Sequence, residues 1–205
     1  MTQNINFTEM LCTRFCHDII GPIGAISNGA EFLRDEMPKL ESQALDLIEN
    51  SGKEAIARVQ FYRHAYGMAA KSGSASLTEA KELTTKFLRG GKITLNWDDK
   101  YTDMSPVSIT DTEKKLIFNL IIIITSTLIR GGVITFTISD SGWVLKSEGK
   151  GAKLDEKIEA TLAGEPQELS PKLVQAIYTQ KLAAESNAKI NIKKLEDIIE
   201  IHVSK

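Results

Sequence analysis

His17 is the residue of this chain whose surroundings most favour chemistry. A neutral imidazole nitrogen is a good nucleophile near pH 7, and the stretch Cys-His-Asp-Ile-Ile-Gly-Pro places Asp18 beside the ring and Pro22 five residues after it. On a helix, the imidazole would share its face with polar and small residues, namely Met10, Thr13, Arg14, Gly21, Gly24 and Asn28. We therefore expect His17 to face solvent or a partner.

Two of these neighbours are glycines that lie one and two turns beyond His17. Glycine in a helix interior costs about 0.5 to 1 kcal/mol relative to alanine, so the pair indicates that something large approaches this face closely. We predict a docking surface here, with partner contacts at Thr13, Ile20, Gly21, Gly24 and Asn28.

Simpler explanations are open for several of these residues. A histidine on an exposed helix face is usually just solvated, and Asp18 and Arg14 can each be plain surface charges. His64 and His202 have no comparable neighbours, and we interpret them as structural or solvent-exposed.

The two cysteines, Cys12 and Cys16, lie one turn apart on or beside the apolar side of the same helix, where free cysteine behaves as a small apolar residue. A zinc site with His17 is unfavourable, because Cys12 and His17 lie roughly 140° apart at ~100° per residue. No further ligand follows at zinc spacing. We expect neither a disulfide nor a bound metal.

The helix that positions His17 is predicted from about residues 6–9 to 36, with a bend at Pro22. Its apolar residues fall on one side, which is expected to be buried: Leu11, Phe15, Ile19, Ile23, Ile26, Ala30 and Leu33. After a turn at residues 37–39, a second helix runs from residue 40 to about 68–70, and its apolar stripe includes Tyr62 and Tyr66. Two antiparallel helices leave apolar surface uncovered, so we predict a homodimer in which two hairpins form a four-helix bundle.

The remainder of the chain alternates differently. The small, polar stretch at residues 71–76 suggests a boundary, with a helical domain at 1–72 and an α/β domain at 73–205. The predicted helices are residues 77–88, 111–129, 154–162 and 171–187. A capping box at Thr110–Glu113 opens the second of these, and the last has a proline in its first turn. The predicted strands are residues 92–97, 133–138, 143–146, 189–194 and 197–203. The fold class is α+β, with helices covering one face of a mixed sheet.

Composition excludes several classes of partner. The chain has 25 basic and 27 acidic residues and a formal net charge of −2, so it carries no electrostatic footprint for nucleic acid or an anionic membrane. The N-terminus lacks the pattern of a signal peptide, and the apolar run at residues 116–129 is too short to span a bilayer. We expect a cytoplasmic protein.

A helical hairpin with His-Asp-x-x-x-Pro, followed by an α/β layer in this order, resembles the dimerisation and ATP-binding halves of sensor histidine kinases. Within that superfamily, residues 11–33 resemble the ChpT-type family of alphaproteobacterial histidine phosphotransferases, through the stretch Cys-His-Asp-Ile-Ile-Gly-Pro-Ile-Gly-Ala-Ile-Ser-Asn-Gly. The later pattern Pro171-x-x-Val-Gln-x-x-Tyr178, followed by Leu182-Ala183, strengthens the resemblance.

The resemblance also shows where a kinase would hold nucleotide and magnesium. Asn119 matches the first asparagine of the kinase N-box, but the second position is Ile123, which cannot ligate a hard cation. Residues 147–151 match the adenine-binding box with serine in place of aspartate, a register we prefer to residues 140–142, and residues 165–171 do not match a glycine-rich lid. We therefore expect a degenerate ATPase-like domain without ATP binding and without a cofactor of its own.

The resemblance implies a phosphorelay. His17 would be phosphorylated by the receiver domain of an upstream hybrid kinase and would pass the group to downstream response regulators of the CtrA and CpdR type, with Mg²⁺ on the receiver. Arg14 would stabilise phosphoryl charge, and Asp18 would orient the imidazole or contact the receiver. The main alternative is a non-catalytic dimer that binds and regulates receivers or kinases; an ATP-dependent kinase is a weaker one.

Overall fold

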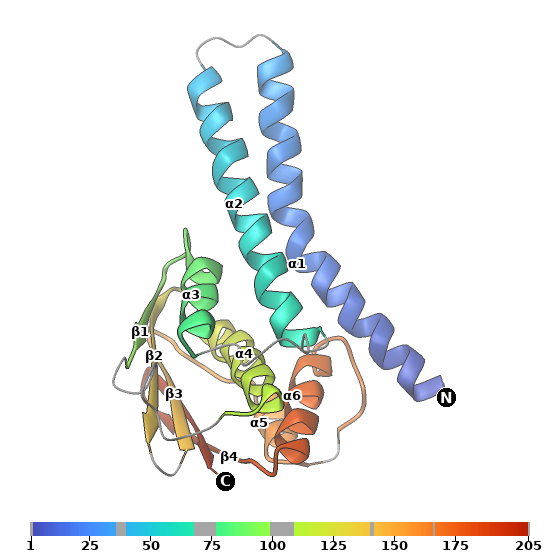
Figure 1. Ribbon diagram of the computed structural model, residues 1–205, viewed down its shortest axis with the longest axis vertical. Helices are drawn as coiled ribbons and strands as arrows, with labels where there is room; N and C mark the ends of the chain where they lie inside the picture. Colours follow the sequence, from blue (N-terminus) through green and yellow to red (C-terminus); the bar gives the residue numbers. More distant parts are fainter. Residues whose placement is uncertain are drawn as a thin grey trace.

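The computed structural model describes residues 2–35, 40–67, 77–98, 109–139, 142–165 and 167–204. Two long helices, α1 (Thr2–Arg34) and α2 (Glu41–Tyr66), run antiparallel as a hairpin that projects from the rest of the molecule (Figure 1). The predicted hairpin is confirmed, whereas the predicted turn at residues 37–39 lies outside the described residues. Among the described residues, no helix is long and apolar enough to cross a membrane.

The first helix bends about midway along its length, as predicted from Pro22 (Figure 1). Its C-terminal half lies along α2, and its N-terminal half diverges toward α6 (Val174–Glu185). There the rings of Phe7 and Tyr178 are 6.1 Å apart, and the Lys181 ammonium lies 4.6 Å from the centre of the Phe7 ring. The bend therefore lets one helix contact both α2 and α6.

The apolar side of α1 is only partly buried. Ile19 and Pro22 are buried, but Ile23, which we expected inside, is 53 % exposed, and Ala30 is also exposed. Cys12 and Cys16, which were placed on or beside this apolar side, are free cysteines and are exposed as well. Helix α2 covers only a narrow stripe of α1, and the N-terminal half of α1 diverges from α2. Most of the apolar side of α1 is therefore only partly buried.

The described residues between 77 and 204, here called the α/β part, form a mixed sheet covered by helices on one face (Figure 1). The strands are β1 (Ile93–Trp97), β2 (Gly132–Ser139), β3 (Gly142–Glu148), β4 (Lys189–Leu195) and β5 (Ile198–Ser204), in the order β1-β2-β3-β5-β4. Only β1 and β2 pair in parallel within this sheet of described residues. The predicted α+β fold is confirmed.

The helices of the α/β part are α3 (Leu77–Leu88), α4 (Asp111–Ser126), α5 (Glu156–Leu162) and α6. The capping box of α4 is present: Glu113 N donates to Thr110 Oγ1 at 3.2 Å, and Thr110 N donates to Glu113 Oε2 at 2.7 Å. Two predicted boundaries in this part are wrong, and so is the start of α1, which begins at Thr2 rather than at residues 6–9. Helix α4 ends at Ser126, before the glycine turn, and α6 begins after Pro171, because residues 171–173 form a separate turn.

The hairpin and the α/β part share one continuous core. Phe61 of α2 is fully buried, and its ring lies 4.1 Å from that of Phe87 in α3 and 5.0 Å from that of Phe118 in α4. Aromatic rings at these distances contribute large buried areas. The C-terminal end of α2 is thus packed into the α/β part. The predicted boundary between residues 72 and 73 lies outside the described residues, and the division into two domains stays a prediction.

Candidate functional site

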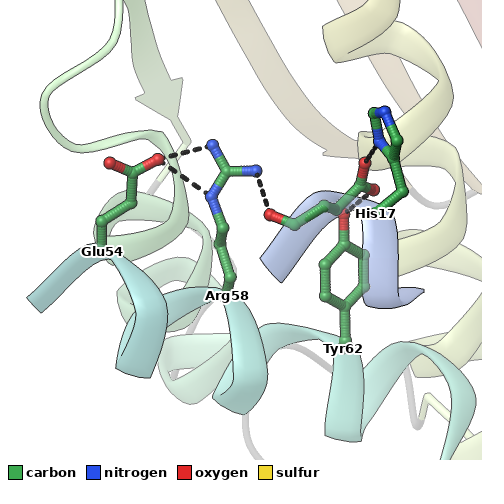
Figure 2. A network of polar contacts seen from close by, with 5 residues as sticks. His17, Glu54, Arg58 and Tyr62 are labelled. Carbon is green, nitrogen blue, oxygen red and sulfur yellow. Dashed lines mark hydrogen bonds and ion pairs between the residues drawn. The ribbon is translucent and has the colours of Figure 1, made fainter. Parts of the chain in front are cut away.

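The candidate site centres on His17 (Figure 2), and the imidazole is exposed, as the helical pattern predicts. The His17 side chain is 84 % exposed, and its Nδ1 lies 3.3 Å from Oδ1 of Asp18. When a neutral imidazole donates Nδ1–H to a carboxylate, its Nε2 keeps an unprotonated lone pair. The arrangement therefore offers Nε2 as a nucleophile to a group approaching from solvent.

Asp18 is in turn held by a tyrosine of the other helix. The Tyr62 hydroxyl of α2 donates to Oδ2 of Asp18 at 2.5 Å (Figure 2). Tyr62 is buried, and burial, together with the neighbouring Asp18 carboxylate, raises the pKa of its hydroxyl far above the usual value. Tyr62 therefore remains a protonated donor throughout the neutral range, and Asp18 has one oxygen for Tyr62 and the other for His17.

The backbone of Asp18 is anchored as well, and Pro22 explains why it can be. Proline has no N–H, so the carbonyl four residues before it loses its helical hydrogen bond. That carbonyl belongs to Asp18, and Nη1 of Arg58 donates to it at 3.2 Å. Glu54 aligns the guanidinium by accepting from Nε at 3.0 Å and from Nη2 at 2.6 Å (Figure 2). Both the side chain and the backbone of Asp18 are thus tied to α2.

Arg14 lies one turn before His17 but is half-buried against α2. It lines a hollow of about 340 Å³ together with Asp18, Arg58 and Tyr62 of the hairpin and residues 87–93 of the α/β part. Its Nε is buried and without a hydrogen-bond partner among the described residues. Burial raises the pKa of Tyr66, and the nearby Arg14 guanidinium partly opposes that rise. Arg14 is therefore placed near the tyrosines as well as near the helix face that carries His17.

The predicted partner contacts lie on the surface. Ile20 is 68 % exposed, and Thr13 and Asn28 are exposed too. Apart from the adjoining residues, a Cβ atom added at Gly21 or Gly24 would meet no described atom within 4 Å, so contacts with the other described elements do not require glycine at either position.

Gly29, on the same helix, provides the contrast. A Cβ atom there would lie 2.7 Å from Cγ1 of Ile48 and 3.0 Å from the carbonyl oxygen of Ala44. The close packing of α1 on α2 therefore accounts for Gly29, whereas no contact between described elements accounts for Gly21 or Gly24.

The sequence reasoning missed the residues of α2 that support His17. Tyr62 was assigned only to an apolar stripe, and Arg58 and Glu54 were not singled out. A signal was present, because Glu54 and Arg58 are spaced i,i+4 and Tyr62 continues the same row of the helix. What the sequence could not show is that this row faces Asp18.

The positions that the resemblance relates to nucleotide and metal binding are occupied by internal contacts. Asn119 and Ile123 are buried in α4, and Ser147 is buried with its Oγ 2.8 Å from Oγ1 of Thr127. A Cβ atom at Gly149 would lie 2.4 Å from the carbonyl oxygen of Gly131. Across the described ranges, no three or more His, Cys, Asp or Glu side chains are grouped to hold a metal ion. The expected lack of ATP binding stays a prediction.

Comparisons with known proteins agree with this architecture. Residues 77–198 match the family model of the histidine phosphotransferase C-terminal domain. The chain is 33 % identical over 203 residues to the protein phosphotransferase ChpT of Brucella abortus (strain 2308), covering 95 % of this chain and 94 % of that protein.

Among solved structures, a bacterial phosphotransferase determined at 1.7 Å aligns with a TM-score of 0.82 and 29 % identity, covering 98 % of this chain and 96 % of that one. A histidine kinase domain from Erythrobacter litoralis EL346 aligns with a TM-score of 0.45 and 12 % identity, over 94 % of this chain and 93 % of that one, which is too weak to support a conclusion. The match over nearly the whole length, with the family model over the α/β part, shows that this chain belongs to the ChpT-type histidine phosphotransferases and is a phosphotransferase.

Proposed function

We propose that this protein moves a phosphoryl group through His17, from the receiver aspartate of an upstream hybrid histidine kinase to downstream response regulators. The observation that carries the proposal is the exposed imidazole whose Nδ1 is held by Asp18, which is itself held by Tyr62. Such a ring presents Nε2 outward in a set orientation, and positioning is the main requirement in phosphoryl transfer.

The chemistry at His17 is a reversible exchange of one bond for another. The Nε2 lone pair attacks phosphorus of the receiver's acyl phosphate, a P–N bond forms, the P–O bond to the aspartate breaks, and the aspartate leaves as a carboxylate. Positive charge develops on the ring, which still carries the proton on Nδ1, and the Asp18 carboxylate 3.3 Å away stabilises it. Transfer to the next receiver reverses these steps, with Mg²⁺ in the receiver's own acidic pocket.

The docking face in this proposal comprises Thr13, Ile20, Gly21, Gly24 and Asn28. Its exposure and the open space above the two glycines support close approach of a receiver. Arg14, near this face, would offset phosphoryl charge. The downstream receivers would be of the CtrA and CpdR type, and the protein would act in the cytoplasm, without nucleic acid or membrane partners.

The proposal includes a homodimer built by pairing two hairpins into a four-helix bundle. Large apolar side chains stand exposed along both helices of the hairpin: Ile23, Phe32, Leu45, Ile56 and Val59. Apolar residues gathered on one element in this way mark an interaction surface. We expect Ile56→Lys, which alters a 61 % exposed side chain, to give a monomer by light scattering. Ile129→Lys, at a 93 % exposed position of the α/β part, is the matched control and should stay dimeric.

The experiment that tests the function is transfer of labelled phosphate from a purified phosphorylated receiver domain, free of ATP, to the wild-type protein and to His17→Ala. We expect acid-labile, base-stable label on the wild type and complete loss in the variant. His202→Gln, which alters a half-buried histidine on β5, should accept label normally. Receiver binding without label on the wild type would refute the relay and leave a non-catalytic scaffold that regulates receivers or kinases.

A further inference from the structure

A chain of buried side-chain amides and a hydroxyl joins the α/β part to the hairpin. Asn119 of α4 is fully buried and Gln175 of α6 is 3 % exposed. Gln175 Nε2 donates to Oδ1 of Asn119 at 2.7 Å, and the Tyr66 hydroxyl of α2 donates to Oε1 of Gln175 at 2.5 Å. Helices far apart in the sequence are thus connected by two consecutive hydrogen bonds.

Asn119 also binds the end of α2 directly. Its Nδ2 donates to the carbonyl oxygen of Ala65 at 2.8 Å and to that of Lys115 at 2.7 Å. The last four carbonyls of a helix receive no hydrogen bond from the helix itself, and Ala65 is the penultimate residue of α2. Asn119 therefore caps the C-terminal end of α2 from another element, while Gln175 occupies its Oδ1.

The connection continues from α2 to His17. The rings of Tyr66 and Tyr62 are stacked, with centroids 5.5 Å apart and an interplanar angle of 5°. Tyr62 in turn donates to Asp18, and Asp18 contacts His17. The place of the Tyr62 hydroxyl thus depends on the position of the last turn of α2, which Asn119 and Gln175 hold.

We propose that Asn119 and Gln175 are positioning residues for phosphoryl transfer: they lock the α/β part onto the end of α2 and so hold Tyr62 and Asp18 in place behind His17. In this role the α/β part is a rigid support for the imidazole. The inference rests on the proposed function, since it concerns the rate of transfer at His17. A residue that only stabilised the fold would instead leave the transfer rate of the folded protein unchanged.

The test measures phosphoryl transfer from a labelled, phosphorylated receiver domain to the full-length chain, with the dissociation constant of the unphosphorylated receiver measured separately. Gln175→Met keeps the length of the side chain and removes both hydrogen bonds, and Asn119→Leu removes the cap on α2. Small misplacements of reacting groups cost up to about 100-fold in rate, so we expect the rate at saturating receiver to fall at least about tenfold, with the dissociation constant within about twofold of wild type.

Thr179→Val is the matched control. Thr179 is buried one turn after Gln175 on α6, and its hydroxyl donates to the Gln175 backbone carbonyl at 2.8 Å, within the same helix. It should transfer at the wild-type rate. Tyr66→Phe removes a single hydroxyl, and it keeps the test decisive if either buried variant fails to fold; a fall in its rate of about threefold or more supports the proposal.

Unchanged saturated rates in the folded variants, or an equal fall in Thr179→Val, would overturn the positioning role while the relay stands. Loss of receiver affinity without loss of saturated rate would overturn it too, because the effect would then lie in docking. Absence of transfer to the wild type would refute the proposed function, and the positioning role with it.

Discussion

Two polar clusters lie at either end of the Tyr62–Tyr66 stack, and only one of them leaves a side chain exposed. At one end, Asn119 and Gln175 are buried, and their amide groups bind each other, Tyr66 and backbone carbonyls. At the other end, Asp18 is tied to α2, but the imidazole of His17 is exposed. Saturated hydrogen bonding confers rigidity, whereas an exposed nitrogen on a rigid base confers reactivity. The molecule uses the first cluster to support the second.

Arg58→Met should weaken the support of Asp18 at the exposed cluster. This change leaves the Asp18 carbonyl without its donor, and an unsatisfied carbonyl of this kind costs about 1–3 kcal/mol. We expect a loss of stability in this range by urea unfolding, with slower phosphoryl transfer. Lys53→Met is the control, because Lys53 pairs with Glu49 on the same helix but both are exposed; a surface pair contributes about 0–1 kcal/mol. Equal losses in the two variants would contradict the role of Arg58.

The pH dependence of stability in alkali tests the buried stack of Tyr62 and Tyr66 that lies between the two clusters. Burial raises the pKa of both Tyr62 and Tyr66 above the usual value near 10. The folded state therefore keeps two protons that the unfolded state loses above about pH 10, so the contribution of these two tyrosines to stability is constant below that pH and falls above it. Each tyrosine contributes up to about 1.4 kcal/mol per pH unit.

Tyr62→Phe and Tyr66→Phe should each make the decline of stability above pH 10 less steep. Denaturant unfolding at a series of pH values up to about 11 measures this slope. Unaltered slopes in both variants would show that neither hydroxyl is held protonated by the fold.

Tyr62→Phe also tests the link between the stack and His17. The ring is kept, but Asp18 loses the hydrogen bond that orients it, which should lower the transfer rate about tenfold, equivalent to about 1.4 kcal/mol. Tyr178→Phe is a suitable control, since its ring packs on Phe7 and Tyr66 rather than on Asp18. Single-turnover transfer measures the effect, and equal rates in the two variants would exclude Tyr62 from positioning Asp18.

Gly24→Ala should produce the smallest change in stability and one of opposite sign. The added methyl group meets no described atom within 4 Å outside the adjoining residues, so unfolding should cost about 0.5–1 kcal/mol more than in the wild type. Affinity for the receiver should fall, because the methyl group stands on the docking face. Gly52→Ala, in open space on α2, should stabilise equally without loss of affinity. A receiver affinity unaffected by Gly24→Ala would argue against close approach there.

Much of the architecture was predictable because it depends on local patterns. Period-two alternation located the strands, the capping box located the start of α4, and glycines marked the ends of α3 and α4 to within a few residues. Errors arose where burial depends on a neighbour: Ile23, Cys12 and Cys16 lie on parts of α1 that no described element covers. A helical period predicts an apolar face but not whether the same chain covers it.

The sequence by itself determined that His17 lies on an exposed helix face next to Asp18, with a helix-bending proline five residues later, because these features depend only on local spacing. Only the tertiary structure decided that the carbonyl released by Pro22 is bound by Arg58, that Tyr62 holds Asp18, and that Asn119 caps α2. These contacts join residues 40 or more positions apart, and hydrogen bonds at such separations depend on how the helices pack, which no local pattern encodes.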